Sequence, residues 1–97
     1  MLRWRTKREP VTVSREIIIS NELGMHARPA AEFVRKAGSF RSDVSLVIND
    51  QRFSATSVID ILRANLERGA KATLEAHGTD AAEAVEALAR LLGELRD

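Results

Sequence analysis

The C-terminal segment constrains the fold most strongly, because its apolar residues recur at helical spacing for about four turns. These residues are Ala81, Ala84, Val85, Leu88, Leu91, Leu92 and Leu95. A helix with one apolar stripe is stable only when another part of the chain covers that stripe. Thr79 or Asp80 is suited to cap the start of this helix. The rest of the chain must therefore supply an apolar surface for it.

Four other segments have the composition and the alternation of β-strands. They are residues 11–20, 44–48, 51–54 and 71–77. In the first, residues 17–19 are all isoleucine and form the part that we expect to be most buried. Asn49 and Asp50 separate the second segment from the third, which predicts a hairpin with a two-residue turn. Alternation in the fourth segment places His77 on its solvent-exposed face.

Two more segments have helical spacing. Residues 28–37 present one apolar face, with Pro29 in the first turn and Gly38 as the stop. Ser57 opens a short second helix, and Asn65 is suited to end it because asparagine tolerates the left-handed conformation. The order strand, helix, strand, strand, helix, strand, helix predicts an α+β fold. We expect a four-stranded, mostly antiparallel sheet with the three helices on one face.

Charge is unevenly distributed along the chain. Residues 1–9 carry four basic side chains against one acidic side chain, whereas acidic side chains outnumber basic ones in the remainder. We expect residues 1–10 to form a flexible basic extension and residues 11–97 to form the domain. A basic tail can bind nucleic acid or an acidic membrane surface. A solvated terminus is the commoner origin of such a tail, so no nucleic-acid partner is expected.

Composition excludes several classes of function. Cysteine is absent and histidine occurs twice, so disulfides are excluded and a metal site would need several carboxylates. We predict neither a metal nor a cofactor. No apolar run approaches the roughly 18 residues that span a bilayer, and we expect a soluble, cytoplasmic protein. A domain of 97 residues is too short for separate substrate-binding and catalytic lobes, so any chemistry must be simple or shared with a larger partner.

The segment from Asn21 to Ala31 carries the candidate chemistry, because it places His26 about where the first helix begins. Backbone N–H groups at a helix start stabilise an anion, and Arg28 can add a charge-assisted hydrogen bond. Gly24 permits a tight turn before the histidine. Imidazole is a suitable acceptor for a phosphoryl group, whose transfer depends mainly on positioning and charge stabilisation. From these residues alone, a helix cap or a surface histidine is the commoner interpretation.

The run Gly24-Met25-His26-Ala27-Arg28-Pro29-Ala30 matches the phosphorylation-site signature of the HPr family at every position. These are histidine-containing phosphocarriers of the bacterial phosphoenolpyruvate-dependent phosphotransferase system, and this chain resembles them from about residue 15 to residue 97. The resemblance implies an open-faced β-sandwich that is a carrier and not an enzyme. It also implies that enzyme I phosphorylates His26 on Nδ1, that Arg28 stabilises the phosphate, and that an enzyme IIA domain receives it.

By the same resemblance, Ser57 occupies the position of a regulatory serine that an HPr kinase/phosphorylase modifies in some bacteria. The apolar patch with which the family docks its partners corresponds here to Met25, Val58, Ile59 and Leu62. A phosphate on Ser57 would place negative charge beside this patch and repel an acidic partner.

Alternatives remain open at this point. The Ser57-Val58-Ile59 run also resembles the nitrogen-branch relative NPr, so the sequence does not separate a sugar-transport carrier from a nitrogen-branch or purely regulatory one. A domain that controls other proteins by docking would not need phosphorylation of His26. Nucleic-acid binding through the basic tail would weaken steeply with salt. We expect a monomer, because only the short second helix leaves part of its apolar stripe uncovered.

Overall fold

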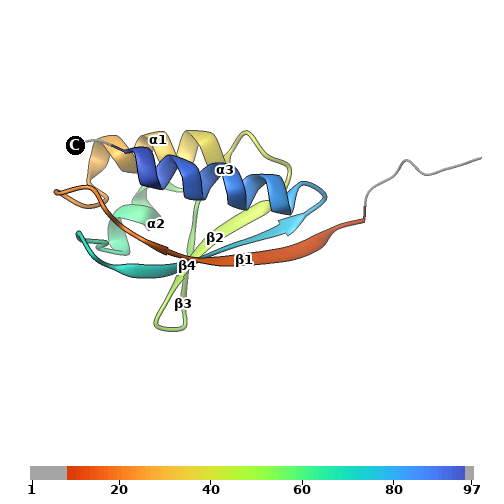
Figure 1. The fold of residues 1–97 in the computed structure, drawn as a ribbon, viewed down its shortest axis with the longest axis horizontal. Coiled ribbons are helices and arrows are strands. Elements are labelled where there is room, and N and C mark those ends of the chain that lie inside the picture. Colours follow the sequence, from red (N-terminus) through yellow and green to blue (C-terminus); the bar gives the residue numbers. More distant parts are fainter. Residues whose placement is uncertain (1–8, 96–97) are drawn as a thin grey trace, which may run out of the picture.

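The computed structural model describes residues 9–95, which form one sheet with helices packed on it (Figure 1). Its elements are β1 (Val11–Ile18), α1 (Ala27–Ala37), β2 (Asp43–Ile48), β3 (Gln51–Ser54), α2 (Val58–Arg63), β4 (Lys71–Gly78) and α3 (Ala81–Glu94). The order of elements and the α+β fold class are those predicted from the sequence. The predicted basic extension lies, except for its last two residues, outside the described part of the chain.

The strands lie in the order β1-β4-β2-β3, and each neighbouring pair is antiparallel. Helices α1 and α3 run side by side over one face of the sheet, while α2 lies between α1 and the end of β3 (Figure 1). Side chains alternate along β4 as predicted, with Ala72, Leu74 and Ala76 buried and His77 exposed. The sheet therefore has one face in the core and one face toward solvent.

The core lies between the sheet and the helices. Its largest fully buried side chains come from strands, helices and the connections between them: Ile19, Pro29, Phe33, Leu46, Ile61, Leu74, Leu88 and Leu92. The isoleucine run at residues 17–19 behaves differently from the prediction, because Ile18 is 55% exposed. Side chains alternate between the two faces of a strand, so Ile17 and Ile19 point inward and Ile18 points to solvent.

Two predicted turns rely on residues that tolerate a positive φ. Asn49 and Asp50 have φ values of 51° and 67°, which is the geometry of a two-residue hairpin turn between β2 and β3. Asn65 has a φ of 54° just after α2, as its left-handed tolerance predicted. These residues bring β3 back onto β2 and turn the chain from α2 toward β4.

Asp80 is the N-cap residue of α3, one of the two candidates from the sequence, but its side chain makes no capping hydrogen bond. Its carboxylate accepts hydrogen bonds from the N–H of Arg41 at 2.9 Å, the N–H of Ser42 at 3.0 Å and the hydroxyl of Ser42 at 2.6 Å. These bonds tie the loop before β2 to the start of α3. Because they favour the charged carboxylate, with the Arg41 N–H contributing most, they lower the pKa of Asp80 below its ordinary value.

We predict that Asp80→Asn lowers stability at neutral pH and makes the protein less sensitive to acid. A lowered folded-state pKa stabilises the fold above the unfolded-state pKa of about 3.9. That contribution is lost as the pH falls through the folded-state value. Urea denaturation between about pH 6 and pH 2 should therefore show a larger loss of unfolding free energy in the wild type than in the variant.

The control is Glu86→Gln, which removes only an exposed ion pair with Arg90 at 3.6 Å and should behave like the wild type. Equal acid sensitivity of the wild type and Asp80→Asn would contradict the assigned role.

Candidate functional site

His26 is the N-cap residue of α1, with φ −83° and ψ −170°, and its side chain is half-buried. The imidazole makes no capping hydrogen bond to the helix, so the interpretation of this residue as a side-chain cap is wrong. The Nε2 atom is buried. The histidine therefore stands at the helix start without using its ring as a cap.

The surroundings of His26 favour an anion. The first N–H groups of an α-helix have no partner within the helix, and in α1 the bonding begins with the N–H of Ala30 to the carbonyl of His26 at 2.9 Å. No acidic residue lies in the first turn of α1. Arg28 is exposed one residue beyond the helix start. A negative group beside His26 would therefore meet helix N–H groups, and Arg28 is the basic residue nearest to His26 in the sequence.

A tight loop sets the position of His26. Gly24 has a φ of +72°, and a Cβ added there would lie 2.4 Å from the carbonyl oxygen of Leu66. The N–H of His26 donates to the carbonyl of Gly24 at 3.0 Å, and the N–H of Met25 donates to that of Leu66 at 2.8 Å. The loop before α1 is thus fastened to the segment that follows α2, and only glycine fits at residue 24.

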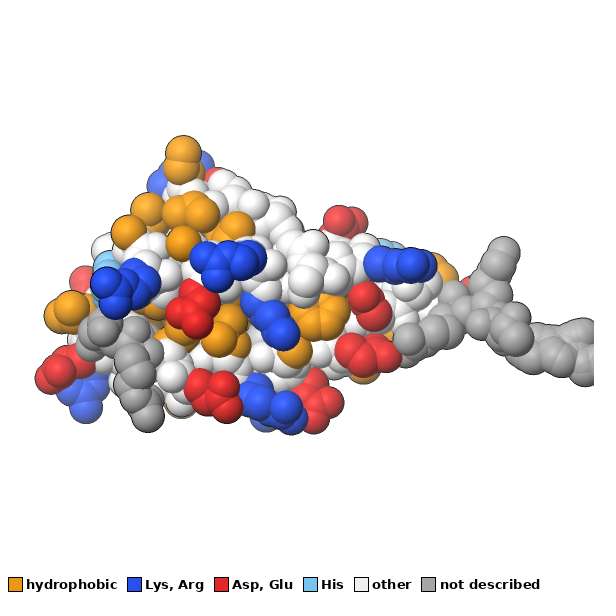
Figure 2. All heavy atoms as spheres, turned by 90° about the horizontal axis from the view of Figure 1, so that it is seen from above, with side chains coloured by type: hydrophobic (Ala, Val, Ile, Leu, Met, Phe, Trp, Pro, Cys, Tyr) orange, Lys and Arg blue, Asp and Glu red, His pale blue; other side chains and the backbone are white. Residues whose placement is uncertain are grey.

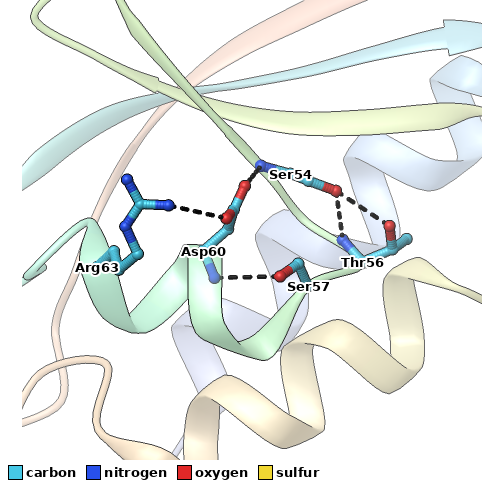
Figure 3. Close-up of polar contacts among 5 residues, drawn as sticks. All are labelled: Ser54, Thr56, Ser57, Asp60 and Arg63. Atoms are coloured by element: carbon cyan, nitrogen blue, oxygen red, sulfur yellow. Dashed lines mark hydrogen bonds and ion pairs between the residues drawn. The ribbon is translucent and has the colours of Figure 1, made fainter.

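Ser57 caps α2, as predicted, because its hydroxyl accepts a hydrogen bond from the N–H of Asp60 at 3.1 Å. The Asp60 carboxylate in turn accepts a hydrogen bond from the N–H of Ser54 at 3.0 Å and forms an ion pair with Arg63 at 3.5 Å. Figure 3 shows both interactions. Hydrogen bonds with Asp60 therefore fix the start of α2 both at Ser57 and at Ser54, which precedes it. The serine is half-buried and its oxygen serves the cap.

The predicted docking patch is only partly at the surface. Ile59 and Leu62 are 69% and 40% exposed, and Val58 is half-buried. Met25 is 4% exposed, so its assignment to the patch is wrong. The backbone bond to Leu66 fastens Met25 to the segment after α2, and its side chain belongs to the core. We call the exposed side chains of Ile59 and Leu62 the α2 patch.

Hydrophobic side chains gather near basic ones at one end of the helical side (Figure 2). In Figure 1 this end carries α2 and the start of α1. Leu23, in the loop before His26, is 67% exposed. Sequence reasoning missed Leu23, although an apolar residue between Glu22 and Gly24 in a loop was a usable signal. The candidate acceptor and exposed apolar surface thus lie at the same end of the molecule.

His77 is exposed on β4, where its Nδ1 lies 2.7 Å from the hydroxyl of Thr12. Within residues 9–95, no three His, Cys, Asp or Glu side chains gather to hold a metal ion. No helix in the same range has the length and apolar character needed to cross a membrane.

Comparison with known proteins identifies relatives of this chain. A family model described as the PTS HPr component phosphorylation site matches residues 13–94. The phosphocarrier protein HPr of Vibrio cholerae is 37% identical over 81 residues, which cover 84% of this chain and 95% of that protein. The HPr of Buchnera aphidicola from Acyrthosiphon pisum is 36% identical over 80 residues, which cover 82% and 94%.

Solved structures of similar fold agree with these relatives. The crystal structure of an HPr from Thermoanaerobacter tengcongensis has a TM-score of 0.81 at 34% identity, and the match covers 84% of this chain and 91% of that one. The catabolite repression protein Crh of Bacillus subtilis, described as a domain-swapped dimer, has a TM-score of 0.69 at 32% identity. That match covers 97% of this chain and 95% of Crh.

We predict that Gly24→Ala destabilises the fold by about 1–3 kcal/mol, because alanine is strained at this positive φ and its Cβ meets backbone atoms. Urea denaturation measures the change. Gly93→Ala in α3 is the matched control, since an added Cβ there meets nothing within 4 Å and alanine favours the helix by about 0.5–1 kcal/mol. Similar stability changes in the two variants would contradict the assigned fit of Gly24.

Proposed function

Because this chain belongs to the HPr family of phosphotransferase-system phosphocarriers, we propose that His26 accepts a phosphoryl group from enzyme I and passes it to an enzyme IIA domain. Proteins of this family are carrier components and not enzymes, so the larger partners supply the remaining catalytic groups. No cofactor enters the proposal. The cysteine-free sequence suits a reducing compartment, and we place the protein in the cytoplasm.

The observation that carries the proposal is the position of His26 at the start of α1, within the family's signature and two residues before Arg28. Burial of Nε2 favours Nδ1 as the atom that is phosphorylated, because a nitrogen without contact to solvent cannot attack the phosphorus atom held by a partner. A bond forms between Nδ1 and phosphorus as the bond between phosphorus and the donor breaks. Onward transfer reverses these roles, which suits a reusable carrier.

Arg28 and the helix start stabilise the phosphoryl group in this proposal. The helix dipole contributes about 0.3–1 kcal/mol for an exposed anion, which alone is too little to hold a phosphate in place. A charge-assisted hydrogen bond from Arg28 adds about 1.5–3 kcal/mol. Arg28 is exposed, so its side chain can follow the phosphate as partners exchange.

The α2 patch is the proposed docking surface for enzyme I and for enzyme IIA domains. Ile59 and Leu62 offer apolar area at the end of the molecule that carries His26. Ser57 begins the same helix. We propose that an HPr kinase/phosphorylase phosphorylates Ser57 and that the added charge weakens docking at Ile59.

A regulatory role is the second candidate. The structural neighbour Crh is named for catabolite repression, and the Ser57-Val58-Ile59 run resembles the nitrogen branch. Cross-reaction with a sugar-specific enzyme IIA would favour sugar transport over this alternative.

We propose a monomer in solution, although Crh and one HPr from Thermoanaerobacter tengcongensis are described as dimers. Light scattering on the purified protein distinguishes the two states.

We predict that His26→Ala abolishes phosphate acceptance and leaves the fold intact, because the ring is half-buried and makes no capping bond. Incubation with enzyme I, magnesium and phosphoenolpyruvate, followed by intact-mass analysis, should show one acid-labile phosphate on the wild type and none on the variant. Arg28→Ala should accept phosphate more slowly. His77→Ala is the matched control and should behave like the wild type. Phosphate on His26→Ala would overturn the assignment.

We predict that Ser57→Asp weakens binding of enzyme I about tenfold, because it places a negative charge beside the α2 patch. Aspartate caps helices well, so α2 should remain folded. Calorimetric titration with enzyme I measures the affinity. Ser39→Asp adds the same charge at the opposite end of α1, where serine is exposed, and should leave the affinity unchanged. Unaltered binding of Ser57→Asp would count against regulation at this residue.

A further inference from the structure

Two polar residues are buried among residues 9–95, namely Asn21 and Ser42, which are 7% and 6% exposed. A polar side chain is kept in the interior only when its hydrogen bonds offset the loss of water. The hydroxyl of Ser42 donates to Asp80, which joins a loop to α3. Asn21 lies five residues before His26, in the loop that leads to the candidate phosphate acceptor.

The side chain of Asn21 holds the carbonyl group to which His26 is also bonded. Its Nδ2 atom donates to the carbonyl oxygen of Gly24 at 2.5 Å, and the N–H of His26 donates to the same oxygen at 3.0 Å. The N–H of Gly24 donates in return to the carbonyl of Asn21 at 3.1 Å. The three bonds close a turn in which Gly24 has a φ of +72°.

This turn fixes the orientation of the peptide group between Gly24 and Met25. It therefore also sets the direction in which the backbone reaches His26. His26 enters α1 as its N-cap residue. Its backbone is held by the bond to Gly24 on one side and by the N–H of Ala30, at 2.9 Å, on the other. On the Gly24 side, the Asn21 amide orients the carbonyl oxygen that accepts the hydrogen bond from His26.

We propose that Asn21 is a positioning residue for phosphoryl transfer, which keeps the Gly24 carbonyl, and with it His26, aligned with the start of α1. The inference rests on the proposed function of His26. Transfer of a phosphoryl group depends on alignment, and a misplacement of about 1 Å can lower a rate about a hundredfold. The Asn21 amide thus acts on transfer through the Gly24 carbonyl, to which it donates a hydrogen bond.

Replacement of Asn21 should not unfold the domain. The bond from Met25 to Leu66, at 2.8 Å, holds the loop independently of the Asn21 side chain. Asn21→Asp keeps the volume of the side chain and replaces the donor by an acceptor, while Asn21→Ala removes the whole amide. Ser42→Ala is the matched control, because it removes a hydrogen bond from an equally buried polar side chain in the loop before β2.

The test combines hydrogen exchange, followed by NMR on the unphosphorylated protein, with the kinetics of phosphate acceptance from enzyme I. In both Asn21 variants the amide of His26 should exchange about tenfold faster than in the wild type. The kcat for acceptance should fall about tenfold with KM unchanged, because the α2 patch is untouched. Ser42→Ala should change neither quantity.

The inference would be overturned if the His26 amide exchanged at the wild-type rate in the Asn21 variants and kcat were also unchanged. That result would leave the proposed function standing. The same changes in Ser42→Ala would also overturn it, because general loss of stability would then explain them. A wild type that accepts no phosphate would overturn the proposed function and the role of Asn21 in transfer together.

Discussion

The site depends on a set of backbone hydrogen bonds that join two connections far apart in the sequence. Beyond the ends of β1 and β4, the N–H of Ile19 donates to Ala70 at 2.9 Å and the N–H of Gly69 donates to Ile19 at 2.7 Å. The bond from Met25 to Leu66 continues this pairing toward α1. Strand pairing is thereby extended into the loops. As a result, the start of α1 and helix α2 lie at one end of the molecule (Figure 1).

Periodicity was sufficient to predict the elements of the fold, because burial on one face leaves a direct trace in the sequence. The alternation in β4 and the apolar stripe of α3 both predicted the observed buried side chains. Residues that tolerate a positive φ also predicted their turns, as Asn49 and Asn65 show. The position of His26 at the start of α1 followed from the boundary between strand and helix.

The errors of sequence reasoning concern contacts between distant segments. Nothing local to Met25 records its bond to Leu66, and a methionine before a surface histidine is compatible with either exposure or burial. Asp80 has the position of a helix cap, but the loop at residues 41–42 offers its N–H groups and a hydroxyl to the carboxylate instead. Such competition between partners is decided by tertiary structure, so a local pattern cannot predict it.

The three helices differ in how their positive ends are neutralised, and the difference bears on function. Asp60 lies in the first turn of α2 and Glu83 in that of α3, whereas α1 has no acidic residue there. A carboxylate at the start of α1 would stabilise the helix by about 0.3–1 kcal/mol, yet it would occupy or repel the position of a phosphate beside His26. In α2 and α3 an acidic side chain supplies the negative charge that stabilises the helix start. In α1 the proposed phosphoryl group on His26 would supply it instead.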